Sequence, residues 1–177
     1  MTTGPFTVTF RHGGKTPPTK VGPGATAADL YESTITVEGP KTGTFRGSIF
    51  PDDMAVKGRI KDGRYPLHIG FHRRDKQPKP TAADLCVRTA GFRAALIVNL
   101  DKTVPVTSDN PDKKTSTYIH VHNGGAEKRG SEGCQTLPAA EWAKFLQLFL
   151  DHYPMLEDWM AVSEYIGVQS GELVVTA

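Results

Sequence analysis

The chain has 177 residues, of which 38% are hydrophobic and 18 are glycine, so its composition is that of a folded globular protein. Its 21 basic residues nearly balance its 19 acidic ones, and no long block of one sign occurs, which argues against a nucleic-acid partner. The two cysteines exclude a disulfide-stapled scaffold. No apolar run approaches the roughly 20 residues of a membrane span, and residues 1–10 lack the basic and apolar regions of a signal peptide, so we expect neither. We expect one domain, residues 1–177.

The first two thirds of the chain predict β-structure. Apolar and polar residues alternate at residues 6–10 and 34–37, as in half-buried strands, and the apolar run 94–98 fits a strand covered on both faces. The pair Asp62-Gly63 suits a tight hairpin turn between two strands. A short helical turn is predicted at 25–31. The predicted strands are residues 6–10, 34–37, 41–49, 55–60, 65–71, 94–98 and 116–122.

The pattern changes to helical in the last third. Trp142, Phe145, Leu146 and Phe149 recur at i, i+3, i+4 and i+7, which predicts an amphipathic helix over 138–152, with Pro138 at its first position. A second helical segment is expected at 155–165 and a closing strand at 172–175. The predicted fold class is therefore α+β and mostly β, a sheet or sandwich with one or two packed C-terminal helices.

The residues suited to chemistry are two histidines and a cysteine. The alternation in 116–122 puts His120 and His122 on one face, and Cys134 follows at a glycine turn that we expect directly before the helix. Because the thiolate is the nucleophile, a catalytic cysteine needs a nearby base, which imidazole supplies. The intervening glycines allow the chain to fold back, and Gly133 would let backbone amides approach a developing oxyanion.

These residues resemble the YkuD-type L,D-transpeptidase family, whose signature pairs a strand-borne histidine motif with a Ser-x-Gly-Cys motif. The resemblance implies a YkuD-like, mostly β fold, a cysteine acyl-enzyme formed on a peptidoglycan stem peptide, and action in the periplasm or cell wall. The short, Glu-bearing motif and the expected lack of an N-terminal signal make this chain similar to divergent family members found in phage and among secreted antibacterial toxins. The matching segments are Val121-His122-Asn123-Gly124 and Ser131-Glu132-Gly133-Cys134.

Each candidate residue has an expected role. We expect Cys134 to be the nucleophile and His122 the general base, with His120 supporting the site. Ser131 is expected to stabilise the turn, Asn123 to orient His122 through its backbone carbonyl, and Arg129 to bind a stem-peptide carboxylate. Arg73 and Arg74 are further anion-binding candidates, although a position on the ordinary solvated surface is the commoner role for each of the three arginines. Cys86, between two apolar residues, fits core packing.

Three alternatives remain open at this stage. His120, His122 and Cys134 would also suit Zn²⁺, but three ligands without a partner cluster favour a site with no metal or cofactor. The thioester would pass to an amine acceptor or to water, which gives cross-linking, D-amino acid exchange or L,D-carboxypeptidase activity. The family commonly has arginine where Thr136 stands, and the loop is short. These departures motivate a non-catalytic module that binds cell-wall peptide or a protein partner.

Overall fold

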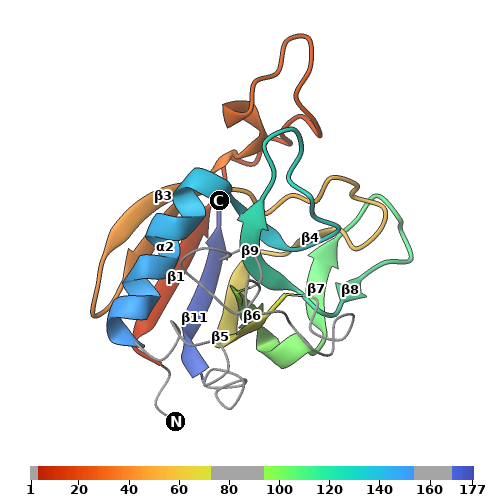
Figure 1. The fold of residues 1–177 in the computed structure, drawn as a ribbon. Coiled ribbons are helices and arrows are strands. Elements are labelled where there is room, and N and C mark those ends of the chain that lie inside the picture. The colour runs from red at the N-terminus through yellow and green to blue at the C-terminus, as the bar shows by residue number, and fades with distance from the viewer. Residues whose placement is uncertain (1–3, 73–93, 154–168) are drawn as a thin grey trace.

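The structure, a computed structural model, describes residues 4–72, 94–153 and 169–177 of the chain (Figure 1). Two β-sheets dominate these residues, and one long helix packs on the larger sheet. Within the described ranges, no helix has the length and apolar character of a membrane span. The predicted fold class, α+β and mostly β with a packed C-terminal helix, is confirmed.

The larger sheet has eight strands and is strongly curved. Its strands are β1 (Phe6–Arg11), β2 (Ser33–Glu38), β3 (Gly43–Gly47), β5 (Gly63–Phe71), β6 (Ala94–Val98), β9 (His120–Gly124), β10 (Gln135–Pro138) and β11 (Gln169–Thr176). Their spatial order is β10-β9-β6-β5-β11-β1-β2-β3, with parallel pairing of β1 with β11 and of β9 with β10. Ser48 and Thr136 exchange backbone hydrogen bonds of 2.8 and 2.9 Å, so the two edges of the sheet meet.

A smaller sheet corrects the predicted hairpin. It joins β4 (Arg59–Ile60), β7 (Val104–Thr107) and β8 (Thr115–Ser116) in that order. The strands before and after Asp62-Gly63 do not pair with each other, because β4 pairs with β7 whereas β5 pairs with β6 and β11. The Asp62 carboxylate accepts hydrogen bonds from His12 at 2.8 Å and Arg59 at 3.2 Å, which holds the chain where it passes between the sheets.

The predicted helix is confirmed as α2 (Ala139–His152), which begins one residue after Pro138. Phe149 packs on Phe6 with ring centroids 4.5 Å apart, and Phe145 meets Phe45 edge-on at 5.6 Å. Burying each large apolar side chain contributes roughly 1.5–3 kcal/mol. The predicted apolar stripe, Trp142, Phe145, Leu146 and Phe149, is wholly buried in the core between helix and sheet. The expected turn at 25–31 forms a short 3₁₀ helix, η1 (Ala28–Leu30).

Strands are present at 6–10, 34–37, 65–71, 94–98 and 172–175 as predicted, whereas 41–49 and 55–60 shorten to β3 and β4. The predicted strand 116–122 is interrupted at Tyr118, which has φ 56° and separates β8 from β9. Cys134 precedes β10 and not the helix, because four strand residues intervene. The predicted helix at 155–165, Cys86, Arg73 and Arg74 lie outside the described residues.

The burial of His68 predicts how the stability of the fold depends on pH. Its ring lies in β5 and is 6% exposed, and this burial lowers the pKa of the imidazole below 6.5 more than a contact with the Ile97 backbone raises it. Below pH 6.5 the unfolded chain therefore takes up a proton that the folded chain does not, so folding stability falls as the pH falls through this range. We expect His68→Gln to flatten the dependence of Tm on pH between about pH 7 and 5. Equal slopes in His68→Gln and the wild type would contradict this account.

Candidate active site

One face of the larger sheet carries the predicted site residues. Across the sheet, His68 of β5 pairs with Ile97 of β6, which pairs with His120 of β9. In the parallel pair, His122 lies beside Thr136 of β10, two residues after Cys134. Since side chains alternate with period two along a strand and partners share a face, Cys134, His120 and His122 are presented on the same face.

Three side chains converge at this face: His72, His122 and Cys134. One ring nitrogen of each histidine and the Sγ atom of Cys134 all lie within 4.8 Å of one another. The His72 ring, just past the end of β5, stacks on the His122 ring with centroids 3.9 Å apart. The structure therefore brings together the cysteine and histidine predicted to react, and adds a second histidine.

The backbone fixes the orientation of His122. Its Nδ1 atom lies 2.7 Å from the carbonyl oxygen of Asn123. A carbonyl oxygen can only accept, so Nδ1 carries the proton and donates it, and Nε2 of the neutral ring holds the lone pair. The orienting contact assigned to Asn123 from the sequence is present in the structure.

His120 belongs to a second layer. Its Nε2 atom lies 2.6 Å from the carboxylate of Asp101, and its Nδ1 lies 3.1 Å from Nδ1 of His72. Asp101 ends the short 3₁₀ segment η3 (Asn99–Asp101), whose three residues all have positive φ, between 52° and 62°. Such conformations cost about 1–3 kcal/mol each in non-glycine residues, and they concentrate where a site requires them. Here the turn carries the Asp101 carboxylate to His120.

Cys134 is held in the interior. Its side chain is 6% exposed, and its thiol donates to the carbonyl of Tyr118 at 3.7 Å. Burial raises the pKa of the thiol to about 11, against the opposing effects of the His120 backbone N–H and the Lys57 ammonium group. The sulfur is therefore protonated at neutral pH, and any nucleophilic step requires proton transfer to a base.

The turn before Cys134 depends on Ser131. Its hydroxyl donates to the Cys134 carbonyl at 2.8 Å and accepts from the Gly133 N–H at 3.1 Å, which is the turn role assigned from the sequence. The Gly133 amide is thus committed to Ser131, and a Cβ at Gly133 would lie 2.7 Å from the Cβ of Lys57. The missing side chain at Gly133 makes room for Lys57, and the expectation that amides around Gly133 and Cys134 stabilise an oxyanion stays a prediction.

The expectation that Arg129 binds a stem-peptide carboxylate is corrected, because the structure places this residue in the interior. Its side chain is 1% exposed, and its guanidinium donates to the carbonyls of Pro18 at 2.7 Å, Leu30 at 3.0 Å and Pro51 at 2.9 Å. The Asp52 carboxylate accepts from the consecutive amides of Arg129, Gly130 and Ser131 at 2.8–3.2 Å. Arg129 therefore holds the loop between His122 and Cys134 in place, and does not face a substrate.

Sequence reasoning missed His72 and Asp101. His72 had a weak signal. His68, Gly70 and His72 are alternate residues at the end of a predicted strand, so an extended chain places both histidines on one face. Asp101 had none, because its position depends on a left-handed turn of three residues that are not glycine.

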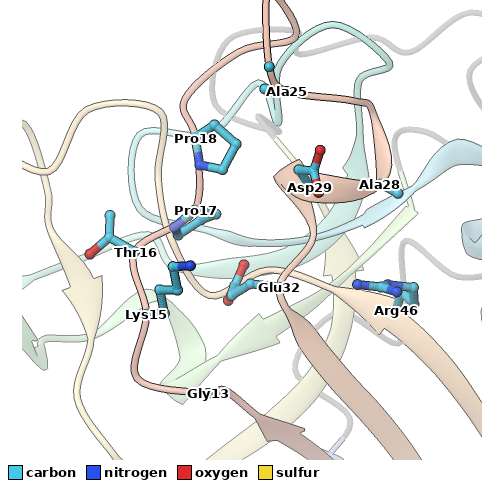
Figure 2. A pocket seen from close by; sticks show the side chains of 11 residues that line it. Gly13, Lys15, Thr16, Pro17, Pro18, Ala25, Ala28, Asp29, Glu32 and Arg46 are labelled. Carbon is cyan, nitrogen blue, oxygen red and sulfur yellow. The ribbon is translucent and has the colours of Figure 1, made fainter.

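A pocket elsewhere on the molecule lies between the N-terminal loop, η1 and β3, and Figure 2 shows Lys15, Glu32 and Arg46 around it. Two of its charged side chains form hydrogen bonds with the surrounding backbone. Glu32 accepts from the Ile49 amide at 3.2 Å, and Arg46 donates to the Tyr31 carbonyl at 3.1 Å. The pocket is separate from the cluster around Cys134.

No family model and no curated protein matches the chain. Among solved structures, the chain is similar to L,D-transpeptidase 1 of Mycobacterium tuberculosis, with 11% identical residues and a TM-score of 0.31. The match covers 97% of this chain and 63% of that one, so this chain spans less than two thirds of its length.

Proposed function

We propose that this chain is a cysteine acyltransferase that acts on peptidoglycan tetrapeptide stems, with Cys134 as nucleophile and His122 as general base. The observation that carries the proposal is the His122 ring, held by the Asn123 carbonyl at 2.7 Å and lying with a ring nitrogen within 4.8 Å of the Cys134 sulfur. Catalytic hydrogen bonds are often long before substrate binds. The contact between sulfur and imidazole is expected to tighten in the complex.

The proton inventory of the resting site supports general-base catalysis. Because burial raises the pKa of Cys134 to about 11, the sulfur does not rest as a thiolate at neutral pH. His122 Nε2 takes the thiol proton as sulfur attacks the carbonyl before the terminal D-Ala. The backbone N–H of Cys134 is the proposed donor to the oxyanion, in place of the Gly133 amide.

The second half of the reaction releases the acyl group. His122 returns the proton to the leaving D-Ala amine, which leaves a thioester on Cys134. An amine, either a diaminopimelate side chain or a free D-amino acid, then attacks the thioester, the carbon–sulfur bond breaks, and the amine proton passes through His122 to the Cys134 sulfur. Attack by water would instead give L,D-carboxypeptidase activity. The resemblance of the His122 and Cys134 motifs to L,D-transpeptidases supports the stem peptide as substrate.

The proposal is tested by incubating the purified chain with tetrapeptide muropeptides, with and without a D-amino acid acceptor, and weighing the products. Loss of D-Ala accompanied by a cross-linked or exchanged product supports acyl transfer. Loss of D-Ala to give only the free tripeptide identifies hydrolysis. A stem peptide that stays intact would contradict the enzymatic proposal, and binding of this intact stem by the chain would favour the non-catalytic module.

The two strand histidines are expected to differ in their effect on turnover. His122→Ala removes the proposed base and should lower kcat/KM by about 10²–10⁴-fold. His120→Ala should cost less, because both His120 nitrogens are engaged, one with Asp101 and one with His72. Kinetics on tetrapeptide muropeptides measure both, with thermal unfolding as a check on folding. The reverse order would mean that the base is misassigned.

A further inference from the structure

The cluster of His72, His122 and Cys134 has the composition of a transition-metal site. We propose that these three side chains bind one Zn²⁺ ion and leave its fourth position open. One nitrogen of each histidine and the cysteine sulfur lie within 4.8 Å of one another. Ligand atoms around a tetrahedral zinc lie roughly 3.5 Å apart, so a shift of about 1 Å would complete the geometry. One thiolate with two imidazoles favours Zn²⁺ over Mg²⁺ or Ca²⁺.

The histidines already have the outer partners that zinc ligands require. A metal-binding imidazole usually donates its other ring N–H to a carbonyl or carboxylate, which fixes the ring and its tautomer. The Nδ1 atom of His122 makes this contact with the Asn123 carbonyl at 2.7 Å. The nitrogen that holds the lone pair of His122 is therefore Nε2, the atom that would coordinate zinc.

His72 is oriented through a longer chain of contacts. His120 donates from Nε2 to Asp101 at 2.6 Å, and in the tautomer that carries its only ring proton on Nε2, its Nδ1 accepts from Nδ1 of His72 at 3.1 Å. This arrangement places the lone pair of His72 on Nε2, as it does in His122. The Asp101 carboxylate is thus linked to the metal position through the His120 and His72 rings. The positive-φ turn that positions Asp101 would therefore help to orient a zinc ligand.

The ligands stand on rigid elements. His122 lies within β9, His72 immediately follows β5, and Cys134 immediately precedes β10. The turn at Cys134 is fixed by Ser131, and the His72 and His122 rings stack at 3.9 Å. Metal binding therefore requires a shift of about 1 Å in ligands that the surrounding strands and turn hold close together, which favours affinity.

Zinc binding would act on the proposed acyl transfer, on which this regulatory consequence rests. Binding replaces the thiol proton of Cys134 with a zinc–sulfur bond and releases one proton to solvent, with no change of oxidation state. The same step occupies the lone pair of His122. The zinc-bound and transferring states are therefore mutually exclusive, and zinc holds the enzyme inactive.

The binding test uses the full chain stripped of metal and titrated with Zn²⁺ against a chromophoric chelator. We expect one equivalent to bind, and His72→Ala and Cys134→Ser each to weaken binding by at least about tenfold. The exposed His152→Ala is the matched control and should bind as the wild type does. Unchanged binding in both ligand variants, or no binding by the wild type, would overturn the site.

Co²⁺ provides a readout that does not depend on how well the variants fold. The wild type loaded with Co²⁺ should show a sulfur-to-metal charge-transfer band, and its absence would contradict coordination by Cys134. Activity separates this inference from the proposed function. A metal-free chain that transfers stems yet binds no Zn²⁺ overturns the zinc site alone. A chain that binds Zn²⁺ through these ligands yet never turns over stems supports the site and overturns the enzymatic proposal.

Discussion

Cys134→Ala is expected to abolish turnover of tetrapeptide muropeptides, with a fall in kcat of at least about a thousandfold. The variant lacks the sulfur on which the thioester must form, and its turn, held by the Ser131 hydroxyl, involves only the backbone of residue 134. Intact-mass measurement of the wild type mixed with substrate should show a tripeptide-stem adduct. The same measurement on Cys134→Ala should show none.

Folding must be checked because the thiol is buried, contrary to the accessible position that a reactive cysteine suggests. Cys134 is 6% exposed, and removing its sulfur should cost about 1 kcal/mol of stability. Thermal unfolding of Cys134→Ala should therefore remain cooperative with a modestly lower Tm. Undiminished turnover by this folded variant would discard the mechanism. Retained binding of stem peptide by an inactive wild type would favour the non-catalytic module.

Local patterns predicted the elements of this fold better than their pairing. The strand 94–98 and the stripe on α2 follow from hydrophobic periodicity, which reports only whether a segment buries one face or two. The prediction of a hairpin at Asp62-Gly63 was wrong, because turn residues also suit a chain that leaves one sheet and enters the other. The central place of β11, between β1 and β5, depends on contacts across most of the chain.

The site shows the same division. His122, Cys134 and the Asn123 contact were predictable, since period-two alternation and a glycine turn are local. Cys134 was placed before a helix because the short strand β10, Gln-Thr-Leu-Pro, carries no clear β signal. Arg129 was expected at the surface, bound to a stem-peptide carboxylate or solvated, because charged side chains are rarely buried, and only the fold reveals the carbonyls that surround it.

Arg129→Met is expected to be the most destabilising single change in the described part of the loop between His122 and Cys134. It removes a buried guanidinium and leaves the carbonyls of Pro18, Leu30 and Pro51 without their donor. The Asp52 carboxylate also loses the nearby charge of Arg129, whose Nε lies 3.8 Å away. Breaking such an arrangement costs about 3–5 kcal/mol, a large share of the stability of a typical domain.

Urea denaturation measures this loss as a change in the free energy of unfolding. Lys128→Met is the matched control, because it removes the neighbouring charge from an exposed position and should change stability by less than about 0.5 kcal/mol. Arg129→Lys should fall between the two, since one ammonium group cannot reach the three carbonyls that the planar fork reaches. Equal stability of Arg129→Met and Lys128→Met would contradict the structural role. If Arg129 holds the loop, turnover should fall from Lys128→Met to Arg129→Lys to Arg129→Met, in the order in which these variants lose stability. The reason is that the loop sets the position of Cys134 relative to His122, although Arg129 itself touches no reacting atom.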